Sequence, residues 1–161
     1  MCPPPETNWI EFGSSCYNFA VSDQKWAEAK AFCQDRGAQL LLIESPEEND
    51  FITEEMAKQS KPRVWIGCRY DDTGDRWLCY SDYVKEMTYS IWAQGADPGA
   101  TNMCTVRYTG EEWYGINCDV AAKSLFTVCE TTGIAGGAPL TSAPRSMTCL
   151  VMGDNGRPTT N

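Results

Sequence analysis

Nine cysteines and no histidine in 161 residues constrain this chain more than any other feature of its sequence. No two cysteines have the Cys-x-x-Cys spacing, and the lack of histidine removes the common zinc sites and the Cys–His and Ser–His catalytic pairs. A carboxylate would need a strongly shifted pKa to act as a general base near neutral pH. We therefore predict disulfides, an oxidising compartment and a protein that is not an enzyme.

Charge and hydropathy limit the partners and the location of the chain. The net charge is −9 and the pI is about 4.4, so nucleic acid is not an expected partner, although an acidic surface can attract Ca²⁺ or a basic protein patch. The N-terminal residues MCPPPETNW contain no apolar run typical of signal peptides, and no stretch approaches the roughly 20 apolar residues of a membrane span. These features predict a secreted or extracellular ectodomain fragment.

The segment that follows Ser22 has the periodicity of a helix. Either Ser22 or Asp23 can serve as its N-cap, and Gly37 suits the left-handed conformation that ends many helices. The apolar residues that recur near a period of 3.6 are Trp26, Ala29, Phe32 and Cys33.

A second helix is predicted from Pro46 onwards. Ser45 and Glu48 have the spacing of a capping box, and proline is favoured at the first helical position. The predicted buried stripe consists of Phe51, Ile52, Met56 and Ala57.

The other segments predict short strands and one long loop. Strand segments are expected at 9–21 (two strands joined by a turn at 13–15), 40–43, 64–80 (a hairpin), 103–118 (a second hairpin) and 124–130. Residues 81–103 are irregular, and a loop of this length inside a domain is often functional.

The composition changes after residue 130. Residues 131–161 are rich in Gly, Ala, Pro, Ser and Thr, which predicts a flexible tail or linker. Residues 1–130 then form one α+β domain, with two helices and antiparallel strands.

Several motifs in residues 2–130 resemble the long form of the C-type lectin-like domain. They are WAEAKAFCQDRGAQLLLIESPEENDFI, WIGC at 65–68, the Cys–Cys hairpin with Trp113, and FTVCE. Cys68 replaces the aliphatic residue that usually ends the family's Trp-Ile-Gly-Leu motif. The resemblance implies a C-type lectin-like fold, in which two helices flank small antiparallel sheets and a long irregular loop forms the ligand face.

The resemblance also implies a disulfide pattern. The family's pairs correspond to Cys33–Cys129, Cys104–Cys118 and, in the long form, Cys2–Cys16. Cys68 and Cys79 lie outside the basic pattern, but they flank one hairpin and most simply bridge each other. Cys149 remains unpaired in the tail, where it suggests a partner chain, a neighbouring domain or a free thiol.

In sugar-binding members of the family, one Ca²⁺ in the long loop bonds directly to sugar hydroxyls. The matching positions here hold Asp97-Pro98-Gly99, a neutral Asn102, and Tyr114 and Gly115 in place of an Asn-Asp pair. Calcium takes about six to eight oxygen ligands, and this set supplies one carboxylate and one amide. We therefore expect no cofactor and no calcium at the sugar site. Tyr114 either packs or offers an aromatic surface to a ligand.

A second acidic cluster is a weak metal candidate. Asp71, Asp72 and Asp75 lie near a structural calcium position of some members, but Asp and Gly at a hairpin tip are also ordinary turn residues. Four tryptophans match core positions of the family: Trp65, Trp77, Trp92 and Trp113.

The sequence leaves three functions open. The first is a non-enzymatic recognition module that binds a carbohydrate or protein ligand without calcium. The second is a calcium-dependent lectin with an altered ligand set, and the third is a structural, disulfide-linked dimer joined through Cys149. The candidate ligand-binding residues are Asp97, Asn102, Arg107, Glu111, Glu112 and Tyr114.

Overall fold

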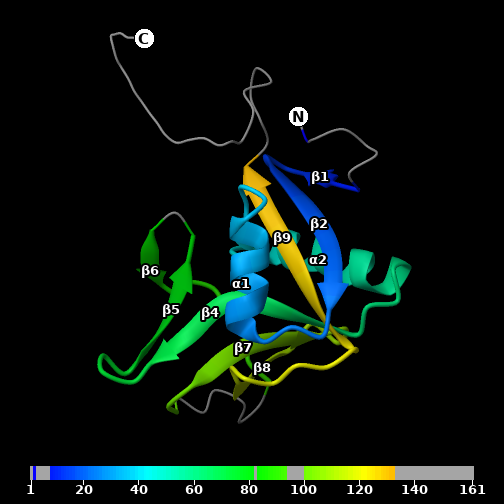
Figure 1. Cartoon of the computed structure of the whole chain (residues 1–161). Coiled ribbons are helices and arrows are strands. Elements are labelled where there is room, and N and C mark those ends of the chain that lie inside the picture. The colour runs from blue at the N-terminus through cyan, green and yellow to red at the C-terminus, as the bar shows by residue number, and fades with distance from the viewer. Residues whose placement is uncertain (1, 3–7, 82, 94–99, 133–161) are drawn as a thin grey trace, which may run out of the picture.

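The strands of this protein form one connected sheet, which the computed structural model describes over residues 2, 8–81, 83–93 and 100–132 (Figure 1). The main strand order is β1-β2-β9-β4-β5-β6, with β3 paired to β9 and with β7 between β4 and β8. The elements are β1 (Ile10–Phe12), β2 (Ser15–Ser22), α1 (Trp26–Gln34), β3 (Gln39–Leu40), α2 (Pro46–Lys58), β4 (Arg63–Asp71), β5 (Arg76–Tyr80), β6 (Val84–Glu86), β7 (Met103–Tyr108), β8 (Trp113–Asn117) and β9 (Leu125–Thr132).

The C-terminal strand β9 lies between the N-terminal strand β2 and the central strand β4. β2 pairs antiparallel with β9, and β9 pairs parallel with β4. The predicted turn between β1 and β2 is confirmed, and Gly13 adopts a φ of 61° there, which glycine tolerates at no steric cost. β9 continues to Thr132, two residues beyond the end that the sequence pattern indicates.

Helix α1 begins later than the sequence predicts. Ser22 is still paired in β2, and Asp23 has a φ of 66° and donates its N–H to the carbonyl oxygens of Ala122 and Leu125 at 3.0 and 3.2 Å. The predicted cap at Ser22 or Asp23 is therefore wrong, because contacts with a segment a hundred residues away hold these residues outside the helix. Lys25 is the N-cap, and its N–H donates to the Glu28 carboxylate at 2.9 Å.

Helix α2 follows its sequence signals closely. Ser45 is the N-cap, and its Oγ accepts a hydrogen bond from the Glu48 N–H at 3.1 Å. Glu48 reaches back one residue further than in a standard capping box, because its Oε1 accepts from the Glu44 N–H at 2.9 Å. Ile52 and Met56 are buried as predicted and Phe51 is half-buried, but Ala57 is exposed.

Helices α1 and α2 lie on opposite faces of the β2–β9 ribbon, and each covers part of the core (Figure 1). The α2 side contains Tyr17 and Trp113, and the α1 side contains Trp26 and Trp65. Three of the four predicted core tryptophans are buried, and Trp92 is half-buried against the same core.

Both predicted hairpins are present, and the segment between them contains an additional strand. β4 pairs with β5, and β7 pairs with β8. Within the segment predicted to be irregular, Val84–Glu86 forms β6 and pairs with β5. None of the helices that the structure describes is long and apolar enough to cross a membrane.

The described residues contain the four disulfides that the sequence analysis proposed. They are Cys2–Cys16, Cys33–Cys129, Cys68–Cys79 and Cys104–Cys118. Cys33–Cys129 joins α1 to β9 across a sequence separation of 96, and the chain-entropy model gives such a loop about 4–5 kcal/mol. Cys149 lies outside the described residues.

Candidate ligand-binding site

The candidate ligand residues that the structure describes lie at different places along the β7–β8 hairpin. Asp97, with Pro98 and Gly99, lies outside the described residues. Met103 pairs with Asn117 at the open end of the hairpin, whereas Val106 pairs with Tyr114 near its tip. The structure therefore places Asn102 at one end of the hairpin and Tyr114 towards the other.

Asn102 ties the start of β7 to the end of β8. Its backbone has a φ of 59°, and its carbonyl oxygen accepts from the Cys118 N–H at 3.0 Å. Its side-chain oxygen accepts from Arg69 at 3.3 Å, and its side-chain nitrogen donates to Asn117 at 3.3 Å and Asp119 at 3.1 Å. Both ends of the amide are engaged beside the Cys104–Cys118 disulfide.

Arg107 lies inside the domain, so its proposed place on the ligand face is wrong. Its side chain is 0% exposed and contacts α2, where Nη1 lies 3.3 Å from the Met56 sulfur and Nη2 donates to the Thr53 hydroxyl. The alternation of β7 explains this, because Arg107 points to the face opposite Val106 and Tyr108. Burial lowers the pKa of the Arg107 guanidinium to about 10.

Tyr114 and the two glutamates lie near the hairpin tip. Tyr114 is half-buried, and its ring meets the ring of Tyr108 edge-on with centroids 4.8 Å apart. Its hydroxyl donates to Glu112 at 3.4 Å, and desolvation followed by the charge of Glu112 raises the Tyr114 pKa. Glu111 and Glu112 are exposed. Tyr114 thus packs on one side and offers part of its ring to solvent.

The described residues do not fit a calcium ion at the usual sugar position. Tyr114 packs against a neighbouring ring, Gly115 has no side chain, and the amide of Asn102 is held by three partners. Across the described part of the chain, no three His, Cys, Asp or Glu residues gather in a way that could hold a metal ion.

The aspartates at the β4–β5 turn each bind a different partner. Asp71 accepts from the Thr73 hydroxyl at 2.7 Å, and hydrogen bonds from Thr73 lower the Asp71 pKa. Asp72 accepts from Thr101 at 2.8 Å, and Asp75 accepts from the Tyr70 hydroxyl. This arrangement supports a turn role for these weak metal candidates.

Arg63 and Tyr108 are surface residues that the sequence analysis did not single out. They are paired across β4 and β7, and the Arg63 guanidinium carbon lies 5.7 Å from the centre of the Tyr108 ring. The alternation of β7 could have indicated the face of Tyr108, but the partner strand could not be read from the sequence.

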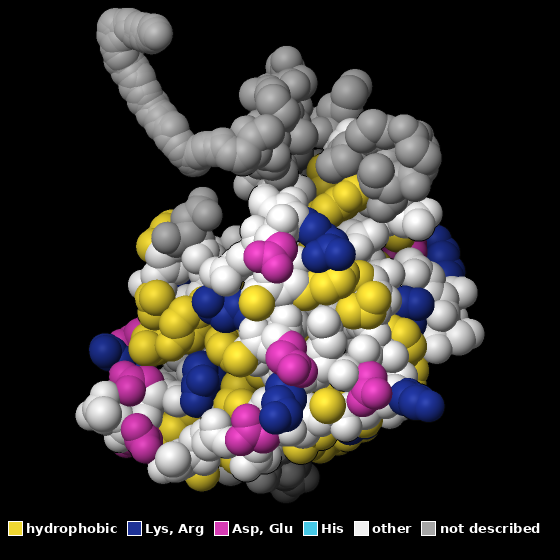
Figure 2. Space-filling model, in the orientation of Figure 1, with side chains coloured by type: hydrophobic (Ala, Val, Ile, Leu, Met, Phe, Trp, Pro, Cys, Tyr) yellow, Lys and Arg dark blue, Asp and Glu magenta, His cyan; other side chains and the backbone are white. Residues whose placement is uncertain are grey.

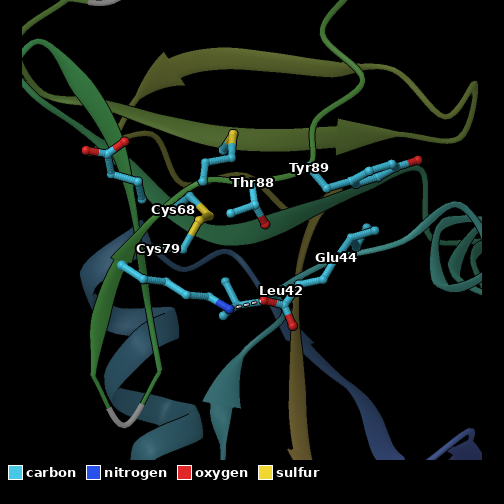
Figure 3. A pocket seen from close by; sticks show the side chains of 10 residues that line it. Leu42, Glu44, Cys68, Cys79, Thr88 and Tyr89 are labelled. Atoms are coloured by element: carbon cyan, nitrogen blue, oxygen red, sulfur yellow. Dashed lines mark hydrogen bonds and ion pairs between the residues drawn. A yellow bond between two sulfur atoms is a disulfide. The ribbon is translucent and has the colours of Figure 1, made fainter.

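A small crevice lies beside the β5–β6 hairpin, away from these residues (Figure 3). The Cys68–Cys79 disulfide forms part of its wall, and Lys85 and Glu44 form an ion pair at its edge. Its lining consists of Leu42, Ile43, Glu44, Cys68, Cys79 and residues 85–89. None of the candidate ligand residues that the structure describes lines it.

Comparison with known proteins identifies the family. Residues 22–131 match the model of the "Lectin C-type domain". The chain is 35% identical over 136 residues to "Asialoglycoprotein receptor 2" of Mus musculus, which covers 80% of this chain and 42% of the receptor. It thus spans less than half of that relative's length.

Two solved structures have the same fold. One is a cow C-type carbohydrate-recognition domain of CD23 in the presence of a GlcNAc2Man3 oligosaccharide, with 28% identity, a TM-score of 0.68, and coverage of 83% of this chain and 98% of that one. The other is an "SPL-1 - GlcNAc complex", with 26% identity, a TM-score of 0.67, and coverage of 78% and 93%. Domains of this family are non-enzymatic recognition modules. By sequence and by fold, this chain belongs to the C-type lectin domain family.

Proposed function

We propose that this domain is an extracellular recognition module that binds a carbohydrate ligand without calcium at the usual sugar site. The observation that carries the proposal is the pair Tyr114 and Gly115, which stand where the resemblance implies two oxygen ligands of the metal. The Tyr114 ring packs edge-on against Tyr108, and glycine offers only its carbonyl oxygen.

A third ligand position of the same calcium site gives independent support. Asn102 stands where the family has an acidic residue, and its amide already bonds to Arg69, Asn117 and Asp119. A calcium ion would have to displace these bonds and would still gain no negative charge from this residue. Among the residue types at the matching sequence positions, Asp97 is the one carboxylate, and calcium takes about six to eight oxygens.

The similar proteins support a glycan as the ligand. Both solved structures cited above are described with a GlcNAc-containing sugar, and one is named as a carbohydrate-recognition domain. The four disulfides support an extracellular location, because such bonds persist in oxidising compartments.

A glycan array probed in CaCl₂ and again in EGTA tests the proposal. We expect the same glycans to be enriched in both conditions. Enrichment that disappears in EGTA would favour the calcium-dependent lectin. If this domain binds no glycan but binds a protein ligand, the carbohydrate assignment is contradicted.

A further inference from the structure

A row of polar and aromatic side chains crosses the outer edge of β4, β7 and β8. Arg63 donates from Nη2 to the Ser124 hydroxyl at 2.8 Å, and its guanidinium lies 5.7 Å from the Tyr108 ring centre. The centres of the Tyr108 and Tyr114 rings are 4.8 Å apart, and the Tyr114 hydroxyl donates to the Glu112 carboxylate at 3.4 Å. We call Arg63, Tyr108, Tyr114 and Glu112 the Arg–Tyr strip.

The strip reaches solvent because it lies where the core ends. Cys104 and Val106 are fully buried on the same face of β7, and Tyr108, two residues further, is 36% exposed. Arg63 is the first residue of β4, and Tyr114 is half-buried. Two aromatic rings at an angle of 70° thus form a partly open corner beside a cation.

Two lysines lie near Arg63 in the chain or beside its partner Ser124, although the chain as a whole carries a charge of −9. Lys61 lies over the Phe126 ring, and Lys123 is the neighbour of Ser124. Among the described residues, no carboxylate oxygen lies within 4.0 Å of Lys61, Arg63 or Lys123. The face shown in Figure 2 has cationic and acidic side chains interspersed.

The Arg63 guanidinium has unused hydrogen-bonding capacity. It carries five N–H donors in a planar fork, and within the described part of the chain its hydrogen bond goes to the Ser124 hydroxyl. Such a fork matches the two oxygens of a carboxylate or the oxygens of a sulfate.

We propose that the Arg–Tyr strip binds an acidic sugar residue. Its carboxylate or sulfate meets Arg63, the apolar C–H face of its ring lies on Tyr108 and Tyr114, and a hydroxyl donates to Glu112. This inference rests on the proposed glycan recognition and extends it, because it names the ligand chemistry and a surface that uses no metal.

The order of groups along the strip favours an acidic sugar over an acidic polypeptide. A sugar presents one anionic group, an apolar ring face and hydroxyl donors within a single residue, which correspond to the cation, the rings and the carboxylate of the strip. A polyanionic peptide that followed the same path would meet the negative charge of Glu112.

The test is a titration with three trisaccharide- or disaccharide-sized probes in EGTA and at low salt. Sialyllactose carries a carboxylate, sulfated lactose carries a sulfate, and lactose is the neutral control. We expect at least one acidic probe to bind about tenfold more tightly than lactose. The two acidic probes distinguish a carboxylate ligand from a sulfate ligand.

Arg63→Gln and Arg36→Gln form a matched pair of variants. Both arginines lie over an aromatic ring and donate one hydrogen bond, but Arg36 lies at the end of α1 over Phe32. Arg63→Gln is expected to raise the Kd for the acidic probe about tenfold and leave lactose unchanged, whereas Arg36→Gln changes neither. Tyr108→Ala is expected to weaken the binding of all probes.

Four outcomes would overturn the inference: equal binding of acidic and neutral probes, an unchanged Kd in Arg63→Gln, tighter binding of an oligoglutamate peptide, or no binding of the acidic probes at millimolar concentration. Near-UV circular dichroism and a free-thiol content equal to that of the wild type confirm that each variant has folded. If glycans bind in EGTA with the same Kd in the wild type and in Arg63→Gln, the inference about the strip fails and the proposed function remains supported. Glycan binding that needs calcium would contradict the proposed function itself.

Discussion

The hydroxyl of Tyr17 donates a hydrogen bond of 2.6 Å to the carboxylate of Glu48 inside the domain. Glu48 and Glu130 are each only 8% exposed, and the Glu130 carboxylate accepts from the Leu42 N–H at 3.1 Å. Glu44 donates its N–H to the other oxygen of Glu48. Two acidic side chains therefore join β2, β9 and the N-terminus of α2 in one buried network.

This network predicts that the domain loses stability as the pH rises. Burial, and then the charge of Glu48, raises the pKa of Glu130 to about 8, against an ordinary value of 4.5. The folded state therefore keeps a proton that the unfolded state releases between these two values. We expect the free energy of unfolding to fall by on the order of 4 kcal/mol between pH 4.5 and pH 8, as measured by urea unfolding.

Glu130→Gln is the control for the pH prediction. The amide keeps the shape of the protonated carboxyl and cannot ionise, so the fall in stability over this pH range should become much smaller. Equal slopes for the two proteins would show that the proton on Glu130 is not the cause.

Arg107 is expected to act in packing and not in ligand recognition. Its side chain is buried against α2, and its Nε has no hydrogen-bond partner among the described residues. Arg107→Met keeps most of the volume and removes a buried charge, so we expect a stability within about 1 kcal/mol of the wild type or above it. Arg107→Ala leaves a cavity and should cost about 3 kcal/mol.

Denaturant unfolding and ligand titration of the same Arg107 variants check this prediction. Glycan affinity should be unchanged in Arg107→Met. If Arg107→Met folds but no longer binds glycan, Arg107 takes part in ligand binding and the prediction is wrong.

Asn102 is expected to contribute through its backbone as well as its amide. A φ of 59° disfavours side chains with a Cβ, although asparagine tolerates it. Asn102→Ala should therefore cost about 1–2 kcal/mol and be less stable than Asn102→Gly. Thermal unfolding of the two variants measures the difference, and an alanine variant as stable as the glycine variant would argue against a backbone contribution.

Calcium is expected to leave the melting temperature unchanged. A ligand that binds only the folded state raises its stability in proportion to the logarithm of the ligand concentration over Kd, so a filled calcium site would appear as a higher melting temperature. Differential scanning calorimetry in millimolar CaCl₂, with MgCl₂ at the same ionic strength as the control, makes the comparison. A rise of several degrees in CaCl₂ alone contradicts the prediction.

The features that were predictable from sequence are those set by short-range chemistry. The start of α2 depends on Ser45 and Pro46, which lie beside it, and both hairpins depend on turn residues between apolar runs. The start of α1 was missed because Asp23 bonds to Ala122 and Leu125, far along the chain. The short strand β6 gives no periodic signal, since it is three residues long.

The candidate site was less predictable than the fold. The residues at the positions of the family's calcium ligands supply too few oxygen ligands for calcium, which was visible in the sequence. The hydrogen bonds of Asn102 agree with a structural role for that residue. The buried position of Arg107 and the pairing of Arg63 with Tyr108 both depend on the register of β4 and β7. A single sequence does not give the register between strands that are far apart in the chain.

The place of β9 in the sheet sets the order in which this domain can be made. It is the last of the described strands to be synthesised, yet it lies between β2 and β4 and carries Cys129, the partner of Cys33. During synthesis the hairpin of β4 and β5 can close and oxidise early, whereas β2 remains without its neighbour and Cys33 remains a thiol. In a chain that stops before residue 125, β2 and β4 therefore have no strand between them to pair with, and an oxidase that acts too soon can trap Cys33 with the wrong cysteine.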